Sequence, residues 1–163
     1  MDTERTTQIL EASLERHLRW IAAADTKTGF IFAVCTAMLG FLAAAAPKYG
    51  SWTIAGVVFA ISATVLLVSS LAALFVAVFP RTKGPKLSLI FFGGVADRAI
   101  DQFRRDILGN DEASYLEDVI QQCHINAQIA ATKYAWVKRA AMLLYVAVIP
   151  WVPAAYILFR DRA

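Results

Sequence analysis

The chain has 163 residues, of which 58% are hydrophobic and 18% are charged, and its mean hydropathy is +0.53. A soluble domain of this length does not need so apolar a composition, which argues against a soluble enzyme or binding module. The formal net charge is +3. No aromatic-rich basic module or zinc-ligand spacing accompanies that charge, so we expect no nucleic-acid partner.

Three apolar segments are long enough to cross a bilayer, since a transmembrane helix needs about 20 mostly apolar residues. We predict an all-α membrane protein with three transmembrane helices and long amphipathic cytosolic helical extensions. Residues 1–163 form a single membrane domain in this interpretation. Its segments are a cytosolic helix at 4–27, spans at 28–46, 52–79 and 140–159, and a cytosolic helical segment at 80–139.

The first 24 residues carry an amphipathic pattern. Apolar side chains recur at helical spacing at Leu10, Leu14, Leu18 and Ile21, with charged residues elsewhere on the wheel. No helix-breaking residue separates this stretch from the first apolar run, because Gly29 alone would not end a helix. The pattern therefore predicts one long helix that enters the membrane.

The second span should end at "FPRTKGPK" (residues 79–86), because its prolines and glycine interrupt the helical hydrogen bonds. The following "LSLIFFGG" (residues 87–94) indicates a turn, and residues 96–108 a short helix. A second long helix should start at "GNDEAS", with Asn110 as its N-cap. Its apolar stripe runs into the third span, where Pro150 and Pro153 should introduce a kink. The stripe consists of Leu116, Ile120, Cys123, Ala127, Ala130, Tyr134 and Val137.

Positive charge predicts the topology. Most of the 16 Lys and Arg residues lie either before the first span or between the second and third spans, and cytoplasmic loops are enriched in these residues. We expect the N-terminus in the cytoplasm and the C-terminus in the periplasm of a bacterial inner membrane. The residues just after the second span that favour this orientation are Arg81, Lys83 and Lys86.

A helical wheel divides the first span into a small face and a bulky face. Because small residues let helices approach closely in lipid, we expect the small face to contact protein and the bulky face to contact lipid. A second small row lies on the second span, and three helices cannot readily enclose an aqueous path, so we expect a homo-oligomer. The predicted packing residues are Gly29, Ala33, Gly40, Gly56 and Ala60.

Charged residues stand at the start of the first span. On the wheel Asp25 lies about 40° from Gly29, on the predicted packing side, whereas Lys27 lies about 160° away, towards lipid headgroups. An acid in a helix interface near the membrane normally has a cationic partner. Lys138 is the first choice of partner, so we predict an interfacial latch, with a hydrated, unpaired Asp25 as the alternative. The residues of this predicted latch are Asp25, Lys27, Lys133, Lys138 and Arg139.

Catalytic and metal sites are not indicated. His17 and His124 are accompanied by no ligand cluster or triad, and we expect neither an enzyme nor a bound cofactor or metal. Arg98, Arg104 and Arg105 are candidate contacts for a nucleotide phosphate, although neighbouring aspartates offer local ion pairs instead.

Three stretches give the chain a family resemblance: "HLRWIAAADTKTGFIFAVCTAML", "FFGGVADRAI" and "ATKYAWVKRAAMLLY". Together they resemble the transmembrane effector (PycTM-like) family of Pycsar, a bacterial anti-phage system that signals with cyclic pyrimidine nucleotides. The most specific piece is the pattern of Ala24, Asp25, Lys27 and Gly29, followed by Lys133 and Tyr134 before the last span.

The resemblance implies a toxic effector that damages the inner membrane when infection raises a nucleotide signal. Effectors of that system can carry a separate cyclic-nucleotide-binding domain, for which three spans in 163 residues leave no room. Either the cytosolic part senses a cyclic nucleotide itself, or a separate nucleotide-sensing protein does. The alternative function is a membrane anchor or regulatory subunit that recruits a soluble enzyme or nucleotide sensor.

Overall fold

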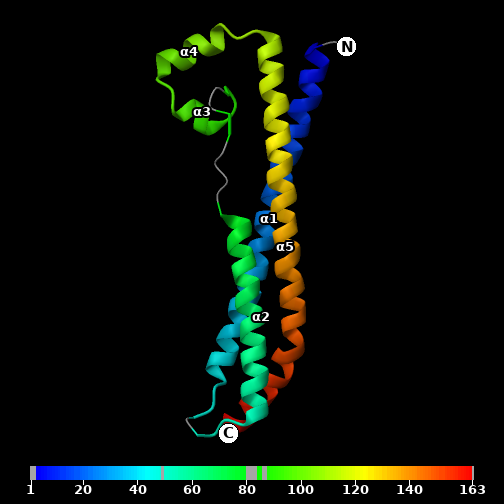
Figure 1. Ribbon diagram of the computed structural model, residues 1–163, viewed down its shortest axis with the longest axis vertical. Helices are drawn as coiled ribbons and strands as arrows, with labels where there is room; N and C mark the ends of the chain where they lie inside the picture. The colour runs from blue at the N-terminus through cyan, green and yellow to red at the C-terminus, as the bar shows by residue number, and fades with distance from the viewer. Residues whose placement is uncertain (1–2, 49, 80–83, 86–87, 163) are drawn as a thin grey trace. The chain divides into compact units, whose positions relative to one another are not determined.

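The computed structural model describes residues 3–48, 50–79, 84–85 and 88–162. These residues form helices and contain no strand (Figure 1). The helices are α1 (Thr3–Ala44), α2 (Ile54–Val78), α3 (Phe92–Ala96), α4 (Ile100–Leu108) and α5 (Glu112–Arg162). Helices α1, α2 and α5 are each long and apolar enough to cross a membrane, which confirms the predicted class of fold.

The long helices follow the sequence prediction closely. Helix α1 runs through both the amphipathic stretch and the first span without a break, as the absence of helix-breaking residues indicates. Pro150 and Pro153 lie inside α5, which continues to Arg162 and bends in its C-terminal part (Figure 1). Helix α2 ends at Val78, with Phe79 of the predicted stop as its C-cap. Residues 80–83 and 86 of that stop, which include Arg81, Lys83 and Lys86, lie outside the described residues.

The connection between α2 and α5 differs from its prediction. Residues 92–96 form the short helix α3 rather than part of a turn, and the next helix begins at Ile100 rather than near residue 96. The Ser88 hydroxyl accepts hydrogen bonds from the backbone N–H groups of Ile90 (3.1 Å) and Phe91 (2.8 Å). These bonds organise the chain just ahead of α3, a role that apolar periodicity does not reveal.

The N-cap of α5 is Asp111 and not Asn110. The Asp111 carboxylate accepts a hydrogen bond from the backbone N–H of Ser114 at 2.7 Å, the bond expected between an N-cap side chain and the third helical residue. The side-chain and backbone hydrogen bonds of Ser114 lower the pKa of Asp111. The prediction chose the wrong one of two adjacent residues that both favour this position.

The chain folds into two compact units. Unit 1 comprises residues 1–23 and 80–132, and unit 2 comprises residues 24–79 and 133–163. Helices α1 and α5 each contribute one segment to both. Each unit is held together by contacts between its own segments of these helices.

In unit 1, α1 contacts α5 through polar and apolar groups. The Tyr115 hydroxyl donates a hydrogen bond to Glu11 at 2.7 Å, which raises the pKa of Tyr115 to about 12. The Cys123 thiol donates to the carbonyl oxygen of Leu10 at 3.1 Å, and burial raises the pKa of that thiol. Leu18 and Ile120 belong to the predicted apolar stripes, which should be buried, but their side chains are 50% and 41% exposed.

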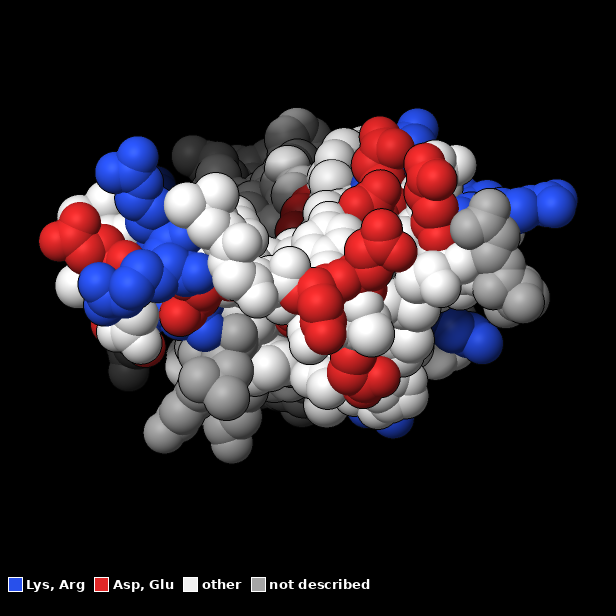
Figure 2. Space-filling view, turned by 90° about the horizontal axis from the view of Figure 1, so that it is seen from above, with Lys and Arg blue, Asp and Glu red and all other residues white. Residues whose placement is uncertain are grey.

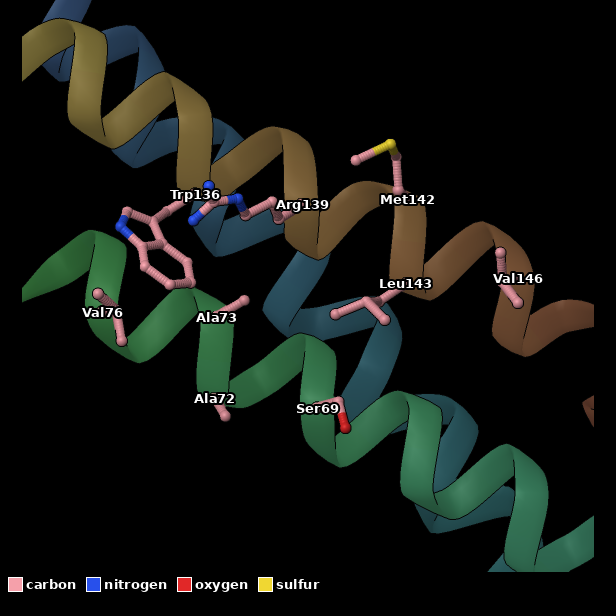
Figure 3. Close-up of a pocket in the computed structure, with 9 residues that line it drawn as sticks. All are labelled: Ser69, Ala72, Ala73, Val76, Trp136, Arg139, Met142, Leu143 and Val146. Atoms are coloured by element: carbon pink, nitrogen blue, oxygen red, sulfur yellow. The ribbon is translucent and has the colours of Figure 1, made fainter.

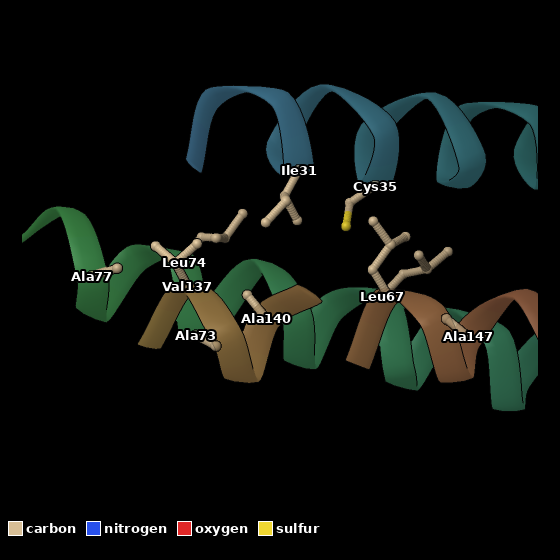
Figure 4. Close-up of a cluster of buried hydrophobic side chains, with 10 residues drawn as sticks. Ile31, Cys35, Leu67, Ala73, Leu74, Ala77, Val137, Ala140 and Ala147 are labelled. Carbon is tan, nitrogen blue, oxygen red and sulfur yellow. The ribbon is translucent and has the colours of Figure 1, made fainter. Parts of the chain in front are cut away.

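In unit 2, α1, α2 and α5 pack around an apolar core. Ile31 and Cys35 of α1 point towards small side chains of α2 and α5 (Figure 4). Those small residues are Ala73, Ala77, Ala140 and Ala147. A second cluster continues along the helices with Leu42, Ala63 and Leu158. At the far end, Thr53 caps α2 and donates a hydrogen bond to Asp161 of α5 at 2.9 Å.

Within the chain, α1 packs through its bulky face and not through its small face. Ile31 and Leu42 belong to the bulky face, which was expected to contact lipid, but both are buried. Gly29, Ala33 and Gly40 of the small face are exposed within the chain. Small residues do line the interface, but α2 and α5 supply them, and α1 contributes the larger side chains that fill the space. Close approach needs a small residue on only one of two facing helices, so the contact within the chain does not require the small face of α1.

Candidate functional site

An ion pair joins α1 to α5 within unit 2, close to residues 24 and 133, where the two helix segments of this unit begin. Lys133 Nζ lies 2.5 Å from Asp25 Oδ1, and the side chains are 15% and 47% exposed, respectively. Asp25 therefore has a cationic partner on α5, but that partner is Lys133 and not Lys138. Lys138 follows Lys133 by five positions on one helix, which turns the two side chains about 140° apart, so only one can face Asp25.

Lys27 also contacts α5. Its ammonium group lies 5.3 Å from the centre of the Tyr134 ring, within the range of a cation–π interaction. Around the axis of α1, Asp25 and Lys27 lie on either side of the buried residues Ala24 and Thr28. Asp25 contacts Lys133 of α5, and Lys27 contacts the next residue, Tyr134. The helical wheel, which placed Asp25 and Lys27 on different sides of α1, agrees with this geometry.

Lys138 and Arg139 face two different grooves. Lys138 lines a groove between α1 and α5, whereas Arg139 lines a groove between α2 and α5. In the second groove the Arg139 guanidinium lies 4.5 Å from the centre of the Trp136 ring, and Trp136 extends towards Val76 of α2 (Figure 3). Neither Lys138 nor Arg139 has a carboxylate partner among the described residues.

A buried polar link crosses all three helices of unit 2. The Ser70 hydroxyl of α2 donates a hydrogen bond to the carbonyl oxygen of Ala140 on α5 at 2.9 Å. The Ser70 hydroxyl oxygen in turn accepts a hydrogen bond from the Cys35 thiol of α1 at 3.5 Å. Ser70, Cys35 and Ala140 are all 0% exposed. This link was missed from the sequence, where the only available signal is a pair of serines within an apolar helix.

The candidate phosphate-binding arginines of unit 1 are in different environments. Arg98 is engaged internally, because its guanidinium donates to the carbonyl oxygen of Ser88 at 2.9 Å and lies 3.4 Å from Asp106. Its side chain is only 7% exposed. Arg104 and Arg105 of α4 are exposed. Figure 2 shows basic and acidic side chains close together at the left of the view, where α4 lies, and a further band of acidic side chains to the right of the centre.

Unit 1 also contains a network centred on Ser88. The Gln122 side chain of α5 donates to the Ser88 hydroxyl at 3.2 Å, and Asp118 accepts from the backbone N–H of Leu89 at 2.7 Å. Arg98 belongs to the same network through its hydrogen bond to the carbonyl oxygen of Ser88. Its contacts therefore hold in place the chain that precedes α3. No group of three or more metal-ligating side chains occurs in the described part of the chain.

Comparison with protein families supplies the identification. The model of the Pycsar effector protein domain, PycTM, matches residues 9–160, which is nearly the whole chain. The chain belongs to the Pycsar effector family. It is accordingly a transmembrane component of anti-phage defence. The comparisons with curated proteins and with solved structures found no match.

In this Pycsar effector, the matched region contains every residue of the predicted latch and every predicted packing residue. The structure brings Asp25 together with Lys133 and Lys27 together with Tyr134. Gly56 is tightly packed, since an added Cβ would lie 2.9 Å from the Thr53 hydroxyl and 3.1 Å from Ile157. Ala60 packs against the second apolar cluster.

Proposed function

We propose that this effector assembles into a homo-oligomer that perturbs or permeabilises the bacterial inner membrane when a nucleotide signal reports infection. The observation that supports assembly is the unused small face of α1: an added Cβ at Gly29 or Gly40 would meet nothing within 4 Å. The interior of unit 2 is filled by side chains such as Leu67 and Ala140, both 0% exposed. A conducting path would therefore require several copies.

The proposed orientation places the N-terminus in the cytoplasm and the C-terminus in the periplasm, on the basis of the distribution of Lys and Arg. The ion-paired end of unit 2 then lies at the cytoplasmic boundary of the bilayer. This is the side on which a cytosolic nucleotide or sensor protein is accessible. The proposed partners are thus the lipid bilayer, further copies of the chain, and a cyclic nucleotide or its separate sensor.

Induced expression combined with a membrane-potential dye tests the function directly. We expect the bacterial membrane to depolarise once the defence system is triggered and to stay polarised before triggering. A protein that inserts normally but never depolarises the membrane would instead act as an anchor that recruits a soluble enzyme. Fractionation of the same cells shows whether the protein has inserted.

Substitution of Gly40 by Leu tests assembly separately from folding. Because the structure leaves space around Gly40, Gly40→Leu should weaken cross-linking between copies and reduce depolarisation, with little change in the thermal stability of the detergent-solubilised protein. Gly56→Leu is the matched comparison, since overpacking against Thr53 and Ile157 should cost about 1–3 kcal/mol of stability.

Cross-linking in native membranes provides the decisive observation. If wild-type protein yields only monomers, both at rest and after triggering, assembly is refuted. If Gly40→Leu assembles as wild type does, the small face of α1 is not the interface.

Thermal unfolding with cyclic nucleotides tests direct sensing. If Arg104 and Arg105 hold a nucleotide phosphate, a cyclic nucleotide at about 100 times its Kd should stabilise the protein by about 2.7 kcal/mol. Arg104→Gln combined with Arg105→Gln should abolish that shift and leave the melting temperature without ligand unchanged, since both side chains are exposed. If no cyclic mononucleotide or oligonucleotide shifts the melting, sensing belongs to a separate protein.

A further inference from the structure

The groove between α1 and α5 in unit 2 has a volume of about 650 Å³. Most of its wall is apolar and comes from both helices. Helix α1 contributes Phe30, Val34 and Met38, and α5 contributes Leu144, Tyr145 and Val148. Phe30 is 71% exposed and Tyr145 is 74% exposed, so the groove is open to the surroundings of the helices.

One end of this groove is cationic. Lys27 of α1 and Lys138 of α5 both line it, together with Tyr134, whose ring lies 5.3 Å from the Lys27 ammonium group. Neither lysine forms an ion pair with a described carboxylate. Asp25, the nearest acid along the sequence, is already paired with Lys133. Two positive charges from two helices therefore converge on the groove without a protein counter-ion.

The polarity of the groove identifies its occupant. We infer that it binds one anionic phospholipid, with the phosphate group between Lys27 and Lys138 and an acyl chain along the apolar wall. Basic pockets between transmembrane helices on the cytoplasmic side of a membrane are suited to anionic headgroups. A nucleotide or free phosphate would satisfy the lysines but would leave the apolar wall uncovered. A phospholipid satisfies both parts of the groove.

A second copy of the chain fits the groove less well. The acidic residues of unit 2 are Asp25 and Asp161. Asp25 is paired with Lys133, and Asp161 accepts a hydrogen bond from Thr53 at the other end of the unit. The spans of a neighbouring copy therefore have no unpaired carboxylate to offer Lys27 and Lys138. This charge argument favours lipid over a protein partner.

Thermal unfolding of the full chain in detergent, with added phospholipid, tests the inference. Phosphatidylglycerol should raise the melting temperature more than phosphatidylcholine with the same acyl chains, because lipid that binds the folded state stabilises it. Lys27→Gln and Lys138→Gln should each weaken the apparent affinity for phosphatidylglycerol about fivefold, as expected for one lysine near an anionic headgroup. The double variant should show no preference for the anionic lipid.

Matched variants separate this site from general attraction between charges. Arg139→Gln removes a cation at a similar depth in the other groove and should keep the preference for phosphatidylglycerol. Lys27→Arg combined with Lys138→Arg should keep it as well. Val148→Trp should weaken the binding of both lipids, because it fills the apolar part of the groove.

Several results would overturn the inference. Equal stabilisation by the two phospholipids, or an unchanged preference in the double Gln variant, would exclude a selective lipid site. An equal shift with glycerol 3-phosphate alone would show a simple anion site. A Val148→Cys variant that forms disulfide-linked dimers in membranes, with no effect of phosphatidylglycerol on stability, would show that a second copy fills the groove.

Discussion

Ser70→Leu is expected to lower the free energy of unfolding of the detergent-solubilised protein by about 2–4 kcal/mol. The substitution removes the hydrogen bond from α2 to the Ala140 carbonyl and deprives the Cys35 thiol of its acceptor. It also forces a larger side chain into a position that is 0% exposed. Unfolding by titration with SDS, followed by circular dichroism, measures the loss.

The adjacent serine provides the control for Ser70. Ser69 is exposed, lines the groove between α2 and α5, and donates its hydroxyl hydrogen to Val65 of its own helix at 2.7 Å. Ser69→Leu should leave stability nearly unchanged, because the new side chain meets lipid or detergent. Ser70→Ala should cost about 0.6–1.7 kcal/mol, between the average and the largest value for hydrogen bonds between transmembrane helices. Equal losses for the two Leu variants would show that the buried link does not hold the helices together.

Lys133→Glu is expected to destabilise unit 2 by about 1–2 kcal/mol. The change replaces a 2.5 Å ion pair with two carboxylates that face each other, and Asp25 is 47% exposed, which moderates the cost. Asp25→Lys combined with Lys133→Glu should restore most of the stability by reversing the pair. The melting temperature in detergent is the primary measurement, and depolarisation on triggering shows whether the latch influences function.

Lys138→Glu is the informative comparison for Lys133→Glu. Lys138 is exposed on the same helix and has no described carboxylate partner, so reversing its charge should change the stability of lipid-free protein little. If Lys138→Glu is as destabilising as Lys133→Glu, the ion pair is not the cause. If neither variant differs from wild type in stability, assembly or depolarisation, Asp25 is only a residue at the membrane boundary.

The two lysines therefore have separate roles in one short stretch of α5. Lys133 forms an ion pair with Asp25, and Lys138 remains available to a ligand in the groove between α1 and α5. The same division applies to α1, where Asp25 is paired and Lys27 lies beside Tyr134. The ion pair with Lys133 balances the negative charge of Asp25. The positive charges of Lys27 and Lys138 have no such partner among the described carboxylates.

The fold was predicted more completely than the site. Long apolar stretches and the absence of breakers between residues 4 and 46 were sufficient for α1 and for the three spans. Asp111 instead of Asn110 as N-cap, and the helix at residues 92–96, are errors of a residue or a few residues. They depend on single hydrogen bonds that periodicity does not encode.

The predictions for the site were correct about which helices meet at Asp25 and wrong about the residue that meets it. A wheel for α1 alone places its residues around one axis but contains no information about how α5 is rotated. The small face illustrates the same limit. Gly29 and Gly40 suggested a contact, yet Ile31 and Cys35 form the actual contact within the chain.

The sequence alone determined that this protein is an all-α membrane protein with three spans, and its motifs indicated the Pycsar effector family. Those properties depend on the free energy of placing apolar residues in lipid and on local helix formation, which neighbouring residues determine. Only the tertiary structure decided that Lys133 pairs with Asp25, that Ser70 bonds to α5, and that Lys27 and Lys138 share a groove. The rotation and register of three helices are set together by their mutual packing, so no helix taken singly specifies its partners.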